Sequence, residues 1–224
     1  LYHAHAQRLA LMLQNQTEEE FADSRFQVLS ELTRLRQLCC DPALVYENYE
    51  GGSAKLDLCI ELIQSAVESG HKILLFSQFT SMIEILTARL QEESISYFVL
   101  QGSTKKEQRA QMVEQFNRDD TSVFCISLKA GGTGLNLTGA DIVIHYDPWW
   151  NVAVENQATD RAHRIGQKNV VTVYKLIAKG TIEEKIIKLQ QRKKELAEEI
   201  LSGDEIKTAS FQREELLELL EERF

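Results

Sequence analysis

Five short apolar runs, separated by amphipathic segments, limit the folds open to this chain. The runs are Lys72 to Phe76, Tyr97 to Leu100, Val123 to Ile126, Asp141 to His145 and Val170 to Ile177. The first and third are apolar at consecutive positions, as in strands that are buried on both faces of a parallel sheet. Helical patterns of about 10 residues or more separate the first three runs, which is typical of βαβ units. The sequence therefore predicts an α/β fold, with a parallel sheet between layers of helices.

A helical extension is expected before this region. Residues 1–41 have apolar side chains at spacings of three and four, which predicts a helix. It should end at Asp41, because Pro42 keeps the residue before it out of the helical conformation. The segment Tyr46 to Ser53 is rich in Asn, Glu, Gly and Ser and is the expected linker.

Helices are also expected after the α/β region. Apolar positions after Thr181 follow a helical period, and a weaker pattern of the same kind runs from Phe211 to Leu220. Together these patterns divide the chain into three parts. The expected domains are a helical extension and loop at 1–50, the α/β domain at 51–180, and C-terminal helices at 181–224.

Three helix starts are predicted from capping boxes, in which a hydroxyl side chain and a Glu three positions later satisfy two backbone amides reciprocally. The pairs are Ser81 with Glu84, Thr104 with Glu107, and Thr181 with Glu184.

The net charge of −9 argues against a nucleic-acid partner unless the charge is unevenly distributed. Residues 51–180 carry 13 Lys and Arg against 14 Asp and Glu, so the acidity lies in the flanking segments. A basic face on the central domain is therefore compatible with the composition.

The four cysteines form no C-x-x-C pair and have no His at zinc-ligand spacing, so neither a disulfide framework nor a metal site is expected. No run approaches the roughly 18 apolar residues of a membrane span, and the first residues lack the pattern of a signal peptide. We expect an intracellular protein without membrane contact.

The first candidate site is the glycine-rich segment from Ser127 to Asn136, which follows a predicted strand. Its glycines would let backbone amides approach a phosphate, and Lys129 adds positive charge. A dinucleotide-binding loop is disfavoured because Leu137 stands where its third glycine should be. A tight turn without a ligand stays open as the alternative.

The second candidate is a helix expected from Val152 to Ile165. Gln157, Arg161 and Arg164 would share one of its faces, and two guanidinium groups one turn apart suit phosphate oxygens. The opposite face would bury small or apolar residues: Ala158, Ala162 and Ile165. A solvated charged face, paired with acidic neighbours, is the alternative.

The third candidate is the segment Asp147 to Asn151, which contains Trp149 and Trp150. Successive side chains of an extended segment alternate between faces, so we expect one tryptophan to be exposed. An exposed tryptophan beside a phosphate-binding loop can stack on a sugar or base, whereas a packing anchor is the alternative.

In this order, the segments resemble the second RecA-like lobe of Swi/Snf-type ATPases, a branch of the superfamily-two helicases that translocate on duplex DNA. Ile73 to Thr80 is similar to the family's fourth motif, and Ser127 to Asn136 to its fifth. Gln157 to Gln167, reading Gln-Ala-Thr-Asp-Arg-Ala-His-Arg-Ile-Gly-Gln, is similar to the sixth. The resemblance implies a RecA-like parallel sheet between helices, followed by C-terminal brace helices.

Shorter segments extend the resemblance to about Leu35 to Leu201. Gly102-Ser103-Thr104 with Arg109 resembles the segment after the fourth motif, and Leu35 to Cys39 with Pro42 resembles a landmark between the two lobes. Two positions depart from the family pattern. They are Trp149, where relatives often have Asp, and Val152, where many have Pro.

The resemblance implies a role for each candidate group. Arg161 and Arg164 would be arginine fingers that stabilise charge on the transferring phosphoryl group of ATP. The other implied nucleotide-binding residues are Gln157, Gly132, Gly134 and Asn136. The implied contacts with the DNA sugar-phosphate backbone are Ser77, Gln78, Lys129, Gly131, Trp150 and Asn151.

Two parts of such a motor are missing from the sequence, a G-x-x-x-x-G-K-[ST] loop and an Asp-Glu pair after an apolar strand. In the family they belong to the N-terminal RecA-like lobe, which would hold ATP and Mg²⁺ and would be the partner of this chain. We expect the chain to hydrolyse no ATP alone. With that lobe it would move on double-stranded DNA and remodel protein–DNA complexes.

Two other functions stay open at this stage, an inert DNA- or protein-interaction domain of the same fold and an RNA helicase lobe. The intact set Gln157, Arg161 and Arg164 argues against the first, and the tryptophan pair followed by the sixth motif argues against the second. The lack of a basic targeting cluster favours a bacterial cytoplasm and nucleoid over a eukaryotic nucleus.

Overall fold

The computed structural model describes residues 1–128, 130, 135–162, 169–199, 216–217 and 220. The chain forms two compact units. One consists of Leu1–Glu50 together with Ala178–Phe224, and the other is Gly51–Ile177. Among the helices of the described residues, none is long and apolar enough to cross a membrane.

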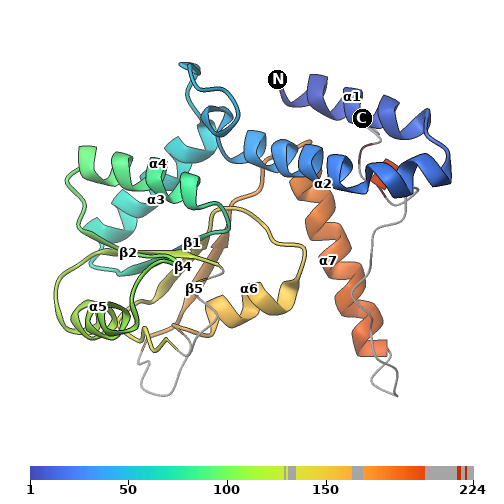
Figure 1. Ribbon diagram of the computed structural model, residues 1–224. Coiled ribbons are helices and arrows are strands. Elements are labelled where there is room, and N and C mark those ends of the chain that lie inside the picture. Colours follow the sequence, from blue (N-terminus) through green and yellow to red (C-terminus); the bar gives the residue numbers. More distant parts are fainter. Residues whose placement is uncertain (129, 131–134, 163–168, 200–215, 218–219, 221–224) are drawn as a thin grey trace. The chain divides into compact units, whose positions relative to one another are not determined.

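The unit at Gly51–Ile177 is built on a parallel sheet of five strands in the order β2-β3-β1-β4-β5 (Figure 1). The strands are β1 (Ile73–Ser77), β2 (Tyr97–Leu100), β3 (Val123–Ser127), β4 (Ile142–His145) and β5 (Thr172–Lys175). Every residue of β1, β3 and β4 is buried, whereas every residue of the edge strand β5 is exposed. The predicted α/β fold with a parallel sheet is confirmed.

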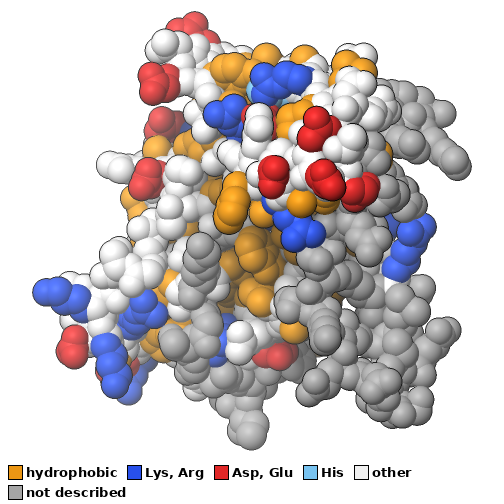
Figure 2. Space-filling model, turned by 45° about the vertical axis from the view of Figure 1, so that its right-hand side comes forward, with side chains coloured by type: hydrophobic (Ala, Val, Ile, Leu, Met, Phe, Trp, Pro, Cys, Tyr) orange, Lys and Arg blue, Asp and Glu red, His pale blue; other side chains and the backbone are white. Residues whose placement is uncertain are grey.

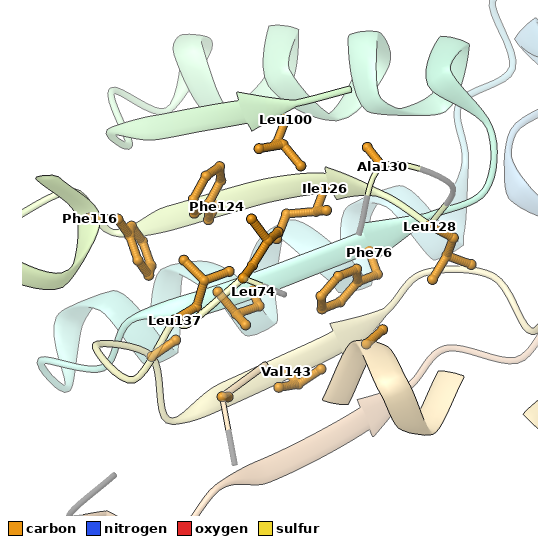
Figure 3. Packing of buried hydrophobic residues seen from close by; sticks show 14 residues of the cluster. Leu74, Phe76, Leu100, Phe116, Phe124, Ile126, Leu128, Ala130, Leu137 and Val143 are labelled. Carbon is orange, nitrogen blue, oxygen red and sulfur yellow. The ribbon is translucent and has the colours of Figure 1, made fainter. Parts of the chain in front are cut away.

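Helices cover both faces of this sheet. They are α3 (Ala54–Glu68), α4 (Thr80–Glu92), α5 (Lys106–Arg118) and α6 (Val152–Thr159). Figure 1 shows α3 and α4 on one face and α5 and α6 on the other. On the second face, Phe116 of α5 meets Phe124 of β3 with ring centroids 5.2 Å apart, within the apolar cluster of Figure 3. This buried cluster is the hydrophobic core beneath the candidate site.

The second unit contains α1 (Tyr2–Gln14), α2 (Glu18–Cys40), the short 3₁₀-helix η1 (Pro42–Leu44) and α7 (Ile182–Glu199). The expectation of one helix over residues 1–41 is wrong, because the helix is interrupted between Gln14 and Glu18. Thr17 and Glu20 form a complete capping box there, a signal present in the sequence that starts a new helix. The expected end at Asp41 is confirmed, since α2 stops at Cys40 and Asp41 is extended.

Two of the predicted capping boxes are wrong. Phe79 precedes α4, so Ser81 lies inside that helix, and Lys105 precedes α5, where Thr104 accepts a hydrogen bond from the Gln101 amide instead. The third start is confirmed in position. Thr181 precedes α7 and its Oγ1 accepts from the Glu183 amide, although Glu184 accepts from Gly180 rather than from Thr181.

Candidate functional site

The candidate groups follow strands whose carboxyl ends lie at the same edge of the sheet, which we call the carboxyl edge. β1 and β3 end in register, at Ser77 and Ser127, and β4 ends next to them at His145. In open α/β sheets, ligands bind beyond this edge. The three segments singled out in the sequence are therefore brought to one side of the domain by the strand directions alone.

The turn after β1 is fixed by Asp147, which follows β4. Asp147 is 1% exposed, and its Oδ1 accepts a hydrogen bond of 2.5 Å from Ser77 Oγ. The backbone amide of Gln78 donates to the same carboxylate, at 3.3 Å from Oδ2. Ser77 Oγ also accepts from the Phe79 amide at 3.2 Å. The Ser77 hydroxyl is therefore used inside the protein, and the half-buried Gln78 is the more accessible of the two predicted DNA contacts.

The glycine-rich segment is held at both ends by α5. At its start, the Ala130 amide donates to Ser127 Oγ, and the Ala130 carbonyl accepts from Arg109 Nη1 at 3.4 Å. At its end, Asn117 Nδ2 donates to the Asn136 carbonyl at 2.8 Å, while Asn117 Oδ1 accepts from the Gly139 amide at 2.9 Å. Four predicted site residues of this segment lie outside the described residues: Lys129, Gly131, Gly132 and Gly134.

Arg109 also organises the neighbouring loop between β2 and α5. Its Nε donates to the Thr104 carbonyl at 2.9 Å, and its Nη2 donates to the carbonyls of Gln101 and Gly102 at 3.1 and 3.2 Å. One guanidinium thus joins two loops at the carboxyl edge, because its planar fork presents several donors at once. Beside it, a hollow of about 770 Å³ opens between α5 and residues 135–136, and Lys106, Arg109 and Asn136 line it.

Exposed basic side chains lie around the same helix. They are Lys105, Lys106 and Arg118, and four exposed acidic side chains lie among them: Glu107, Glu114, Asp119 and Asp120. Figure 2 shows Lys and Arg side chains at the lower left of the molecule, with Asp and Glu side chains among them, where Figure 1 places α5. The described surface around α5 therefore carries charges of both signs.

The tryptophan segment is fixed from behind by α6. Both Trp149 and Trp150 are half-buried, so the expectation that one of them is exposed is wrong. Trp149 packs against the apolar cluster of Figure 3, and its amide donates to Glu155 Oε1 at 2.6 Å. Asn151 Oδ1 accepts from the Ala153 amide at 2.9 Å and caps α6, so this predicted DNA contact has a structural use.

The helix with the two arginines is shorter than expected. α6 ends at Thr159 rather than at Ile165, so Arg161 lies in the turn beyond it and does not share a helical face with the exposed Gln157. Thr and Asp are weak helix formers, and the acidic Asp160 opposes the dipole at a helix C-terminus. Arg161 is 2% exposed, and its carbonyl accepts from the Leu137 amide at 3.0 Å.

The small residues of this segment behave as predicted. Ala158 and Ala162 are buried in the apolar cluster under the site. Arg164 and Ile165 lie outside the described residues.

His145, at the carboxyl end of β4, is buried beneath this turn. Its ring stacks on Phe76 with centroids 5.5 Å apart, and its Nε2 lies 3.0 Å from Thr159 Oγ1. Burial lowers the pKa of His145 to about 4, an effect partly opposed by the nearby Glu155 carboxylate. The imidazole is therefore neutral at physiological pH.

The chemistry available at the carboxyl edge consists of backbone amides, hydroxyls, an amide side chain and guanidinium groups. These groups bind and orient anions. Within the described ranges, no three His, Cys, Asp or Glu side chains are arranged to hold a metal ion. The carboxylate of Asp147, which lies at this edge, is already used in hydrogen bonds with the Ser77 hydroxyl and the Gln78 amide.

The contacts missed by the sequence analysis are Asn117, Glu155 and the bonds made by Arg109. On an amphipathic helix, a polar residue that binds a neighbouring loop occupies the same kind of position as a polar residue that faces solvent. The sequence therefore does not distinguish Asn117 from the solvated polar residues of α5. Arg109 belongs to a segment that resembles a family motif, but its hydrogen bonds to two loops are tertiary contacts that the sequence does not reveal.

Residues 54–166 match the family described as the helicase conserved C-terminal domain. The chain is 45% identical, over 88% of its length, to an uncharacterised ATP-dependent helicase of Mycoplasma pneumoniae, and 44% identical, over 75% of its length, to the human chromatin-remodelling ATPase INO80. It spans only 19% and 11% of the length of these two relatives.

A solved structure of the C-terminal domain of the Sulfolobus solfataricus SWI2/SNF2 ATPase superposes with a TM-score of 0.72 and 33% identity, covering 91% of this chain and 83% of that domain. The core of the same ATPase, solved in complex with double-stranded DNA, gives a TM-score of 0.73 and 34% identity, covering 90% of this chain and 42% of the core.

We expect the packing of α5 against the glycine-rich segment to be sensitive to a single methyl group. In Gly139→Ala, the added Cβ would lie 3.0 Å from the Asn117 Cα and 3.0 Å from its Oδ1. Overpacking of this kind should lower the free energy of unfolding by about 1–3 kcal/mol, as measured by urea denaturation. Gly102→Ala is the matched control, since its Cβ would meet nothing within 4 Å, and it should change stability by less than about 0.5 kcal/mol. Equal stability of the two variants would contradict this packing.

Stability should fall on mild acidification because of His145. Its pKa in the folded state lies below the value of about 6.5 for an unfolded chain, so the unfolded state binds more protons as the pH decreases from 6.5 towards 4. Between pH 7 and pH 5 this should cost about 2 kcal/mol in the free energy of unfolding. His145→Gln should reduce that loss, whereas His3→Gln, at an exposed position, should retain it. An unchanged pH profile in His145→Gln would show that this histidine is not the cause.

Proposed function

Because this chain belongs to the helicase conserved C-terminal domain family and is a Swi/Snf-type C-terminal lobe, we propose that it is the second motor lobe of an ATP-driven translocase on double-stranded DNA. The observation that supports this most is the meeting of three motif segments at the carboxyl edge. Asp147 joins the turn after β1 to the tryptophan segment, and Leu137 joins the end of the glycine-rich segment to Arg161.

The proposed DNA contacts are to the sugar-phosphate backbone, by Gln78, Lys129, Gly131 and Trp150. Contacts with the sugar-phosphate backbone bind DNA without reading its base sequence. A motor that moves along DNA of any sequence requires contacts of this kind. The related ATPase core solved with double-stranded DNA supports this choice of substrate. Ser77 and Asn151 would support the DNA-binding segments without contacting DNA. The Ser77 hydroxyl fixes a turn, and the Asn151 side chain caps α6.

The proposed nucleotide contacts come from the sixth motif and the glycine-rich segment. Arg161 and Arg164 would stabilise negative charge on the transferring phosphoryl group, and Gln157, Gly132, Gly134 and Asn136 would border the nucleotide. Of these, Asn136 and Gln157 have exposed side chains, whereas Arg161 is buried in the turn after α6. Arg161 would therefore contribute both to the fold of this turn and to phosphate binding.

The N-terminal RecA-like lobe is the proposed partner. It would supply most of the ATP site and the Mg²⁺ ligands, since this sequence contains neither a G-x-x-x-x-G-K-[ST] loop nor an Asp-Glu pair after an apolar strand. ATP with Mg²⁺ provides the phosphoryl-transfer chemistry, and this chain would orient the nucleotide and exclude water from the other side. The protein would act inside the cell, where its DNA substrate lies.

Arg164→Ala tests the nucleotide role in a protein that contains both lobes. Loss of an arginine finger should lower the DNA-stimulated kcat by about a thousandfold, while affinity for duplex DNA, measured by fluorescence anisotropy, stays near wild type. Arg161→Ala should lower both kcat and the unfolding temperature, because that side chain is also buried.

Arg118→Ala is the control, since it removes an exposed guanidinium that pairs with Glu114 on the surface of α5. Its kcat should stay within about twofold of wild type, since such surface pairs contribute little. A wild-type kcat for Arg164→Ala would exclude the finger role, and equal losses in Arg118→Ala would point to a general effect of charge.

A further inference from the structure

An ion pair between the buried carboxylate of Glu155 and the exposed Lys175 lies behind the tryptophan segment and has no role in the proposed contacts. Glu155, in the first turn of α6, is 1% exposed, and its Oε2 lies 2.5 Å from Nζ of Lys175, the last residue of β5. Its Oε1 accepts from the Trp149 amide at 2.6 Å. One carboxylate therefore links the edge strand of the sheet to the backbone of the segment that contains both tryptophans.

Lys175 provides a positive charge beside this buried carboxylate. The two carboxylate oxygens of Glu155 have different partners, the ammonium group of Lys175 at Oε2 and the Trp149 amide at Oε1. His145, which interacts electrostatically with Glu155, is neutral at physiological pH because burial lowers its pKa to about 4. Glu155 is buried, so removal of Lys175 leaves its charge less well compensated and should weaken the hold of Glu155 on the Trp149 amide.

Hydrogen bonds fix the tryptophan segment at its beginning, at Trp149 and at its end. Asp147 holds its beginning through Ser77, and Asn151 holds its end through the Ala153 amide. The bond from Glu155 to Trp149 lies between them and fixes the backbone immediately before Trp150. Trp149 packs against the apolar cluster, so the orientation of Trp149 determines where its neighbour is presented.

We propose that Glu155 and Lys175 are positioning residues that set the orientation of the Trp149–Trp150 turn for contact with the DNA backbone. The DNA part of this inference rests on the proposed function. The positioning itself rests only on the fold. Neither side chain would touch DNA or nucleotide, and the pair would act through the backbone of Trp149.

Tryptophan fluorescence tests the positioning directly, because Trp149 and Trp150 are the two tryptophans of the sequence. Lys175→Met, in the 224-residue chain, should shift the emission to longer wavelength and increase quenching by acrylamide. Lys175→Arg should restore both signals, because Arg can also pair with the carboxylate. Lys179→Met, at an exposed position nearby in sequence, removes the same charge and should leave the emission unchanged. Wild-type emission and quenching in Lys175→Met would overturn the positioning role.

The DNA role is tested in the protein with both lobes. The duplex concentration for half-maximal ATPase should rise roughly tenfold in Lys175→Met, the equivalent of about 1.4 kcal/mol, while the rate at saturating DNA stays near wild type. A lower rate at saturation without a change in half-saturation would indicate a merely structural role and would overturn the proposal. An inactive wild-type protein would count against the proposed function alone, since the fluorescence of this chain is measured without ATP or DNA.

Discussion

The buried carboxylate of Asp147 is the interaction on which the arrangement of the carboxyl edge depends. It follows β4 and binds the Ser77 hydroxyl and the Gln78 amide, which follow β1. A buried carboxylate without donors would cost on the order of several kcal/mol, so these two chain segments stay together as long as the domain is folded. The turn of the fourth motif and the tryptophan segment thus form one surface, although about 70 residues separate them in the sequence.

The helices on this face provide the remaining supports. Arg109 and Asn117 of α5 hold the two ends of the glycine-rich segment, and Glu155 of α6 holds the tryptophan turn. Each of these side chains binds backbone atoms, so each fixes the course of a loop rather than a single side chain. The scaffold beneath the loops is rigid because consecutive residues of β1, β3 and β4 are buried between the helix layers. Loops held in this way are the usual location of ligand contacts in α/β proteins.

The sequence was sufficient for the sheet but not for the limits of the helices. Consecutive apolar residues at 73–76 and 123–126 are compatible with few structures besides buried parallel strands, and this prediction is confirmed. Where a helix ends depends on whether the local side chains favour continuing the helix or capping it. Thr17 starts a helix in the middle of a continuous apolar pattern, and Thr159 ends one before the arginine-rich segment.

The candidate site, too, could be predicted from the sequence only in part. The motif segments were expected at one edge because parallel strands place their carboxyl ends together, and the sheet register bears this out for β1 and β3. The contacts of Arg109 with Ala130, and of Lys175 with Glu155, join residues about 20 positions apart and belong to tertiary structure. Periodicity along the chain contains no information on such pairs. The predicted nucleotide and DNA contacts stay predictions, and several of them, including Arg164 and Lys129, lie outside the described residues.

The most direct measurement of the central claim is a complementation assay of ATP hydrolysis. The 224-residue chain, its N-terminal lobe and the protein containing both would each be assayed with duplex DNA, single-stranded DNA, RNA and no nucleic acid. The account predicts that each lobe alone is inactive and that the two together hydrolyse ATP only when duplex DNA is present. Hydrolysis by this chain alone, stimulation by RNA in place of duplex DNA, or no activity of the complete protein with any nucleic acid would contradict it.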